Sequence, residues 1–161
     1  MSSTRRLSCL VAILPLSVAL LFSAACGPAP GDERPAGDVG SAIEDGDMEL
    51  LRQLVEAGAD VNTVTSGISG YTLLHEAADA GNVEAIELLV ANGADTERTS
   101  TVGATPLLLA IGAGHEDAAL ALLEGGADPG RPDGNGTTPL SYARALGQSR
   151  VAAALQSLGA R

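Results

Sequence analysis

The residues best suited to chemistry in this chain are two histidines, His75 and His115, and two cysteines, Cys9 and Cys26. Histidine can act as a general base, cysteine as a nucleophile, and both can bind metals. The histidines are 40 positions apart (115 − 75), and no motif gives either of them a nucleophile or an orienting acid. The spacing of the four residues also fits no zinc site. We therefore expect no catalytic residue, no metal site and no cofactor.

One acidic cluster could be considered for calcium. Glu44, Asp45 and Asp47 surround Gly46. An EF-hand loop places alternating oxygen ligands over about 12 residues, and this stretch lacks that pattern. We interpret the cluster as a solvated boundary between a helix and a turn.

Cys26 carries the clearest chemical expectation because of the residues before it. Two arginines at 5–6 precede a mostly apolar stretch at 7–22, and three small residues at 23–25 follow. This order is typical of a secretory signal peptide, and the stretch is short for a membrane span. We predict a signal peptide at residues 1–25 and a flexible linker, rich in proline and glycine, at 26–37.

The small-small-cysteine ending resembles the lipobox of bacterial lipoproteins. In that family the cysteine is lipidated and becomes the new N-terminus, which would anchor the protein in the bacterial envelope, facing the periplasm or the cell surface. Ser23 departs from the pattern, which more often has leucine there. An ordinary signal peptidase could cut at the same bond and release a secreted protein. A retained membrane anchor is the third alternative.

The rest of the chain is built from a repeated unit. A Gly-Ala pair recurs at residues 58–59, 93–94, 126–127 and 159–160, with a first step of 35 residues and later steps of 33. Three other columns keep this register. They are glycine at 46, 81, 114 and 147, leucine at 54, 89, 122 and 155, and threonine at 72, 105 and 138. A unit of this length predicts a stacked repeat architecture.

The residues inside the unit resemble the ankyrin family. Residues 72–78, Thr-Leu-Leu-His-Glu-Ala-Ala, are similar to its T-P-L-H-x-A-A signature, and residues 58–62 to its G-A-D-V-N ending. Leu108 departs from the family's histidine. The resemblance implies an all-α solenoid of about four helix-turn-helix units with protruding hairpin loops. It spans residues 38–161, with repeats at about 38–68, 69–101, 102–134 and 135–161.

The repeated residues have physical roles in such a unit. Thr72, Thr105 and Thr138 stand where a side-chain oxygen can cap a helix. Pro106 and Pro139 then occupy the first helical position, where a missing N–H costs nothing. We expect hairpins near 61–71, 96–104 and 129–137. We also expect the leucines at 89 and 122 to be buried between units.

The resemblance places the partner-binding surface on the concave face formed by the first helices and hairpins. By register, this surface would include Glu44, Asp45, Tyr71, Glu76, Asp79, Ala104, Leu109 and Tyr142. Its N-terminal half is acidic, and its centre and C-terminal half are apolar. An exposed tyrosine is a favoured interface anchor, but Tyr71 and Tyr142 could equally pack under neighbouring hairpins. In the family, the histidine that corresponds to His75 typically hydrogen-bonds the neighbouring hairpin.

The charge balance restricts the partners. The chain has nine arginines, no lysine and twenty acids. Without the two leader arginines the net charge is near −13 (seven against twenty). This disfavours nucleic acid and anionic lipid, so membrane contact would need the lipid anchor. The acidic charge serves solubility or matches a basic partner. We expect a monomeric, non-enzymatic protein–protein interaction module, the alternative being a secreted effector that acts on a host protein.

Overall fold

A computed structural model describes residues 40–43 and 45–160 of the chain. The predicted signal peptide (1–25), the linker (26–37) and the residues Cys26 and Glu44 lie outside the described residues. The following account concerns the repeat domain alone.

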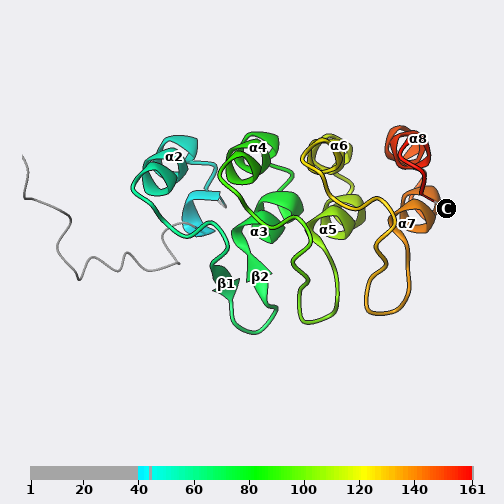
Figure 1. Cartoon of the computed structure of the whole chain (residues 1–161), viewed down its shortest axis with the longest axis horizontal. Coiled ribbons are helices and arrows are strands. Elements are labelled where there is room, and N and C mark those ends of the chain that lie inside the picture. The colour runs from blue at the N-terminus through cyan, green and yellow to red at the C-terminus, as the bar shows by residue number, and fades with distance from the viewer. Residues whose placement is uncertain (1–39, 44, 161) are drawn as a thin grey trace, which may run out of the picture. The chain divides into compact units, whose positions relative to one another are not determined.

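The helices form two parallel rows, as Figure 1 shows. A short helical segment at 40–43 opens the first row. The first row continues with α3 (Leu73–Asp79), α5 (Pro106–Ala113) and α7 (Pro139–Ala145). The second row contains α2 (Met48–Glu56), α4 (Val83–Ala91), α6 (Glu116–Glu124) and α8 (Ser149–Ser157). The two helices of a unit pack on each other in the pairs α3–α4, α5–α6 and α7–α8, and equivalent helices of successive units also pack on each other. The mostly helical repeat solenoid is therefore confirmed.

The connections between units protrude to one side of the helices (Figure 1). In the first connection, β1 (Val64–Ser66) pairs antiparallel with β2 (Tyr71–Thr72). The backbone N–H of Thr101 donates to the carbonyl of Ser69 at 2.9 Å and so joins the first two hairpins. Between the next two, a Cβ built on Gly103 would lie only 2.6 Å from the backbone nitrogen of Gly134. Glycine is needed there because the two loops meet backbone to backbone.

The predicted helix caps are present. The hydroxyl of Thr105 accepts from the N–H of Leu108, and that of Thr138 from the N–H of Ser141, both at 3.3 Å. Thr72 forms a capping box with His75, whose ring accepts a hydrogen bond from the Thr72 N–H. Each bond satisfies an N–H that the helix itself leaves without a partner.

A single apolar core runs between the two rows of helices. Leu51, Leu89, Leu122 and Leu155 on the second helices are almost completely buried, as are Ile86, Leu107 and Ile111. The prediction that Leu89 and Leu122 are buried between units is confirmed. Within residues 40–43 and 45–160, no helix is long and apolar enough to cross a membrane.

Candidate functional site

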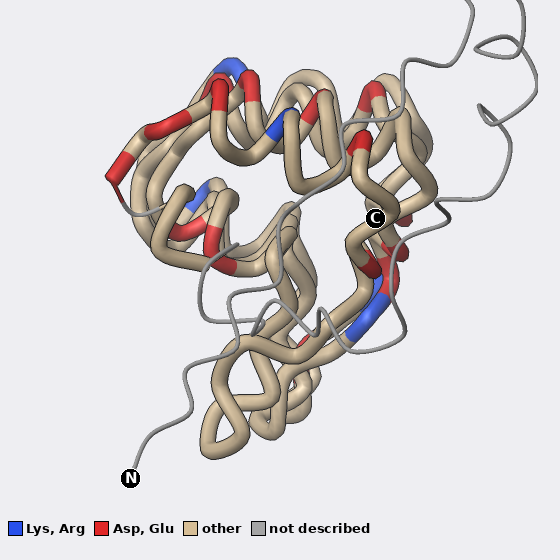
Figure 2. The backbone as a smooth tube through the Cα atoms, turned by 90° about the vertical axis from the view of Figure 1, so that its left-hand side faces the viewer, with Lys and Arg blue, Asp and Glu red and all other residues tan. Residues whose placement is uncertain are grey.

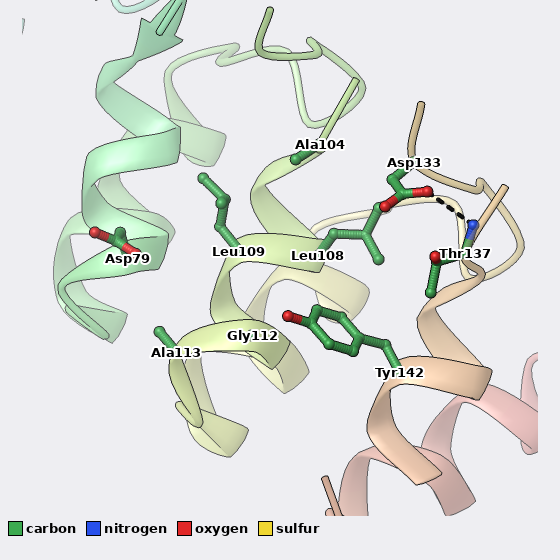
Figure 3. A pocket seen from close by; sticks show the side chains of 9 residues that line it. All are labelled: Asp79, Ala104, Leu108, Leu109, Gly112, Ala113, Asp133, Thr137 and Tyr142. Atoms are coloured by element: carbon green, nitrogen blue, oxygen red, sulfur yellow. Dashed lines mark hydrogen bonds between the residues drawn. The ribbon is translucent and has the colours of Figure 1, made fainter. Parts of the chain in front are cut away.

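A hollow of about 460 Å³ lies on the side of the first helices, between α3, α5, α7 and the hairpin at 129–137. We call it the central hollow (Figure 3). Leu108, Leu109 and Ala113 of α5 form its apolar floor together with Ala104. Its polar lining consists of Asp79, Asp133, Thr137 and Tyr142. The hollow therefore combines an apolar surface with two carboxylates.

A second hollow of about 330 Å³ adjoins the first towards the N-terminus and shares Asp79 with it. It is lined by Ser66, Ser69, Tyr71, Glu76, Asp79 and Ala80, and we call it the polar hollow. Each hollow is lined by two carboxylates, of which Asp79 is common to both, and the apolar floor belongs to the central hollow. Six of the eight residues predicted for the partner-binding surface line one or both of these hollows. Asp45 is exposed but lines neither hollow.

Glu76 differs from the expectation of a solvent-facing acid. Its side chain is half-buried, and its Oε2 atom has almost no contact with solvent. A Cβ built on Gly40 would lie 2.9 Å from this oxygen, so the first unit covers it. Asp79 is the more exposed carboxylate of the pair. The acidic half of the surface therefore presents Asp79 more openly than Glu76.

The sequence left open whether the two tyrosines are exposed on the surface or packed under neighbouring hairpins. Both are half-buried, so each is partly exposed and partly packed. Tyr71 stacks on the ring of His75, with 5.4 Å between ring centroids and 16° between planes. Tyr142 lies against Gly112, where a Cβ would be 3.1 Å from the tyrosine hydroxyl. In Figure 3 that hydroxyl points from α7 towards α5. Each ring is packed on one side and lines a hollow on the other.

The carboxylate of Asp133 is held by its own loop. It accepts hydrogen bonds from the backbone N–H groups of Thr137 at 2.7 Å (Figure 3) and of Asn135 at 2.9 Å. The bond from Thr137, and then the bonds from Asn135, lower the pKa of Asp133 below its usual value because they favour the charged form. Asp133 is therefore ionised at neutral pH and places a negative charge in the lining of the central hollow.

Arginine does not neutralise this surface. Figure 2 shows many acidic positions and only a few arginines along the helices and loops. Three of the five described arginines pair with acids that do not line the central hollow: Arg52 with Glu84, Arg131 with Glu97 and Arg150 with Asp117. None of the five lines the hollow. Within the described residues, no group of three or more His, Cys, Asp or Glu side chains could hold a metal ion.

Comparison with known proteins identifies the family. The family model described as "Ankyrin repeats (3 copies)" matches residues 40–133 and 93–161, which is most of the chain. The chain belongs to the ankyrin-repeat family. Ankyrin repeats form a non-enzymatic fold whose role is protein–protein interaction.

Several curated proteins are similar to parts of these ankyrin repeats. The 2-5A-dependent ribonuclease of Mus musculus is 38% identical over 87 residues, 52% of this chain and 12% of that protein. Potassium channel AKT1 of Oryza sativa subsp. indica is 40% identical over 79 residues, 47% of this chain and 8% of the channel. Protein phosphatase 1 regulatory subunit 27 of Mus musculus is 40% identical over 68 residues, which are 42% of this chain and 44% of that protein. The chain thus spans a minor part of each relative.

His75 joins two ankyrin repeats. Its Nδ1 accepts from the Thr72 N–H at 3.2 Å, so the hydrogen is on Nε2, which donates to the Ala104 carbonyl at 3.2 Å. The hydroxyl of Thr72 lies 2.9 Å from the same Nδ1. Burial lowers the pKa of His75, although the bond to Ala104 opposes this shift. The ankyrin resemblance implied a bond to a neighbouring hairpin, and the bond to Ala104 is such a bond. The geometry thus gives His75 a structural role.

His115 joins repeats in the opposite direction. Its Nε2 donates to the carbonyl of Asp79 at 3.1 Å, and its ring covers Gly81, where a Cβ would be 2.6 Å from the ring. Gln148 occupies the same position one repeat later, and its Nε2 donates to the carbonyl of Ile111 at 2.7 Å. These bonds hold the C-terminal ends of α3 and α5, which line the central hollow.

Sequence reasoning missed part of the site. Leu108 lines the central hollow at the position where the ankyrin pattern has histidine, so this departure was a usable signal. Asp133 also lines it, but it reaches the hollow from the connecting hairpin at 129–137 and not from a first helix. Two hairpin-tip residues were missed as well: Ile68 is 94% exposed and Val102 66% exposed. Exposed apolar side chains on the tips of neighbouring hairpins are a second feature that can serve an interface.

Acidification should destabilise the domain through His75. Its pKa is near 6.5 in the unfolded chain and lower in the folded state. The unfolded state therefore binds the proton first as the pH falls below 6.5. The free energy of unfolding should then fall by up to about 1.4 kcal/mol per pH unit until the folded-state pKa is reached.

Urea melts between pH 8 and 5 measure this dependence. His75→Gln should be less stable overall, because it loses bonds to Thr72 and Ala104, but its stability should vary less between these pH values. If the free energy of unfolding varied equally with pH in the wild type and in His75→Gln, His75 would not titrate as its burial implies.

Proposed function

We propose that this protein is a non-enzymatic module that holds a protein partner on its concave face. The observation that supports this best is the pair of adjoining hollows, which share Asp79 and combine carboxylates with an apolar floor. A protein interface gains affinity from buried apolar anchors and specificity from placed charges, and this surface offers both. The phosphatase relative, named a regulatory subunit, is consistent with a binding role.

We propose further that the partner is basic and that the protein acts as a monomer. Asp79 and Asp133 place two negative charges at the hollows, and no described arginine lines either hollow. A basic segment would meet complementary charge at these two positions, whereas nucleic acid would be repelled.

The proposed location is the bacterial envelope, with a lipid on Cys26 as the only membrane anchor. The support is the order of a basic start, an apolar stretch and small residues directly before that cysteine. The acidic domain would not adhere to anionic lipid by itself. The alternative, a protein cut free at the same bond, would present the same concave face to a host protein.

Leu109→Asp should accelerate dissociation of the partner. The substitution puts an unpaired charge on the apolar floor, and loss of a central contact costs about 2 kcal/mol or more, roughly 30-fold in dissociation rate. Asp79→Lys should instead slow association severalfold and weaken its salt dependence, because exposed charges steer the encounter. The measurement is binding kinetics with a partner captured by affinity from the protein's own envelope.

Leu120→Asp is the matched control, since Leu120 is also half-buried against the core but lies on the second helix α6. Its binding rates should remain close to those of the wild type. If Leu109→Asp stays folded by circular dichroism and binds with unchanged rates, the central hollow is not the binding site.

A further inference from the structure

The central hollow has two carboxylates, and none of the described arginines lines it. Asp79 comes from α3 and Asp133 from the hairpin at 129–137, with Leu108 and Leu109 between them in Figure 3. No ion pair joins either acid to any described residue. Elsewhere on the domain, acids on the second helices are paired with arginine: Glu84 with Arg52, and Asp117 with Arg150. The hollow thus leaves negative charge beside an apolar surface.

The two carboxylates differ in what they can still bind. Asp133 already accepts backbone hydrogen bonds from Thr137 and Asn135, so it contributes charge rather than a free acceptor. The carboxylate of Asp79 is exposed and forms no hydrogen bond within the described residues, while its backbone carbonyl is fixed by His115. Asp79 is therefore the acceptor available to a ligand.

The lining favours an organic cation with a long apolar stem. The floor of Leu108 and Leu109 can cover methylene groups, as the stems of long basic side chains require. The Tyr142 ring lines the same hollow and can receive a cation on its face. A planar guanidinium stacks on an aromatic ring and bonds a carboxylate through two parallel N–H groups, a planar match that a tetrahedral ammonium lacks. Arginine therefore fits this lining better than lysine.

We propose that the central hollow seats one arginine side chain of the protein partner. Its stem would lie on Leu109 and its guanidinium would bond Asp79 beside Tyr142. An apolar residue next to this arginine would cover the remaining floor. The inference rests on the proposed function, because it assumes that the concave face binds a protein, and it adds the identity of the anchoring side chain.

Selection of random peptides on the purified full-length chain tests the inference. We expect peptides with an arginine next to an aliphatic or aromatic residue. Replacing that arginine with lysine should weaken binding several-fold, and replacing it with alanine by about 30-fold, the size of a hot-spot loss. The substitution Asp79→Asn should weaken binding of the arginine-containing peptide but not binding of the peptide in which that arginine is replaced by alanine. Glu124→Gln, which removes another exposed charge, from α6, should leave the binding of both peptides unchanged.

The outcomes separate the two proposals. If the selected peptides lose binding in Leu109→Asp but do not need arginine, the arginine site is wrong and the concave binding face stands. If arginine peptides bind Asp79→Asn and the wild type equally, the assigned contact is wrong. If no selected peptide is sensitive to Leu109→Asp, both the arginine site and the proposed binding face are contradicted.

Discussion

Truncation of Leu89 or Leu122 to alanine should lower the free energy of unfolding by about 2–5 kcal/mol, the usual cost of a large-to-small change in a core. Both side chains have no exposed surface. Leu89 lies on α4, which packs against α2 and α6, and Leu122 lies on α6, which packs against α4 and α8. Because each unit of a repeat protein is stabilised mainly by its neighbours, a cavity at either position weakens two interfaces.

Urea denaturation of each variant measures the loss. Leu158→Ala is a suitable control, because this leucine is 55% exposed at the end of α8 and its truncation should cost less than about 0.5 kcal/mol. A loss below that value for Leu89→Ala or Leu122→Ala would contradict the packing described here.

The sequence predicts the helices and caps well because each repeated column has one local cause. Thr105 and Thr138 cap their own helices, and Pro106 begins one, so these roles follow from neighbouring positions in the chain. The leucine at 89 recurs because every inner unit must bury the same face against its neighbours. A requirement that is local or that recurs in every unit can therefore be recognised directly from the residue pattern.

The lining of the central hollow is less predictable because it depends on contacts between repeats. Asp133 belongs to the loop before α7 yet lines a hollow whose floor is α5. The position of Tyr142 depends on the absence of a side chain at Gly112, and the burial of Glu76 depends on the segment at Gly40. Register alone places these residues on the concave face, but it does not show how deeply each is packed.

Cys26→Ser should move the protein from the membrane fraction to the soluble fraction. Serine cannot form the thioether that attaches the lipid, and no described helix could replace that anchor. Cys9→Ser is the matched control, because Cys9 lies in the predicted signal peptide and its loss should leave the protein in the membrane.

Fractionation with a high-salt wash, followed by mass spectrometry of the mature N-terminus, gives the readout. An acylated cysteine at position 26 supports the anchored form, and a free cysteine supports the secreted alternative. A Cys26→Ser protein that stays in the washed membrane pellet would contradict the lipoprotein assignment.

Hydrogen exchange tests the proposed binding face most directly. The exchange of the domain alone would be compared with that of its complex with the partner captured from the envelope. Slower exchange should appear in α5, in α7 and in the hairpins around residues 96–104 and 129–137, which surround the central hollow. Protection confined to α4, α6 and α8, with the first helices unchanged, would contradict binding on the concave face.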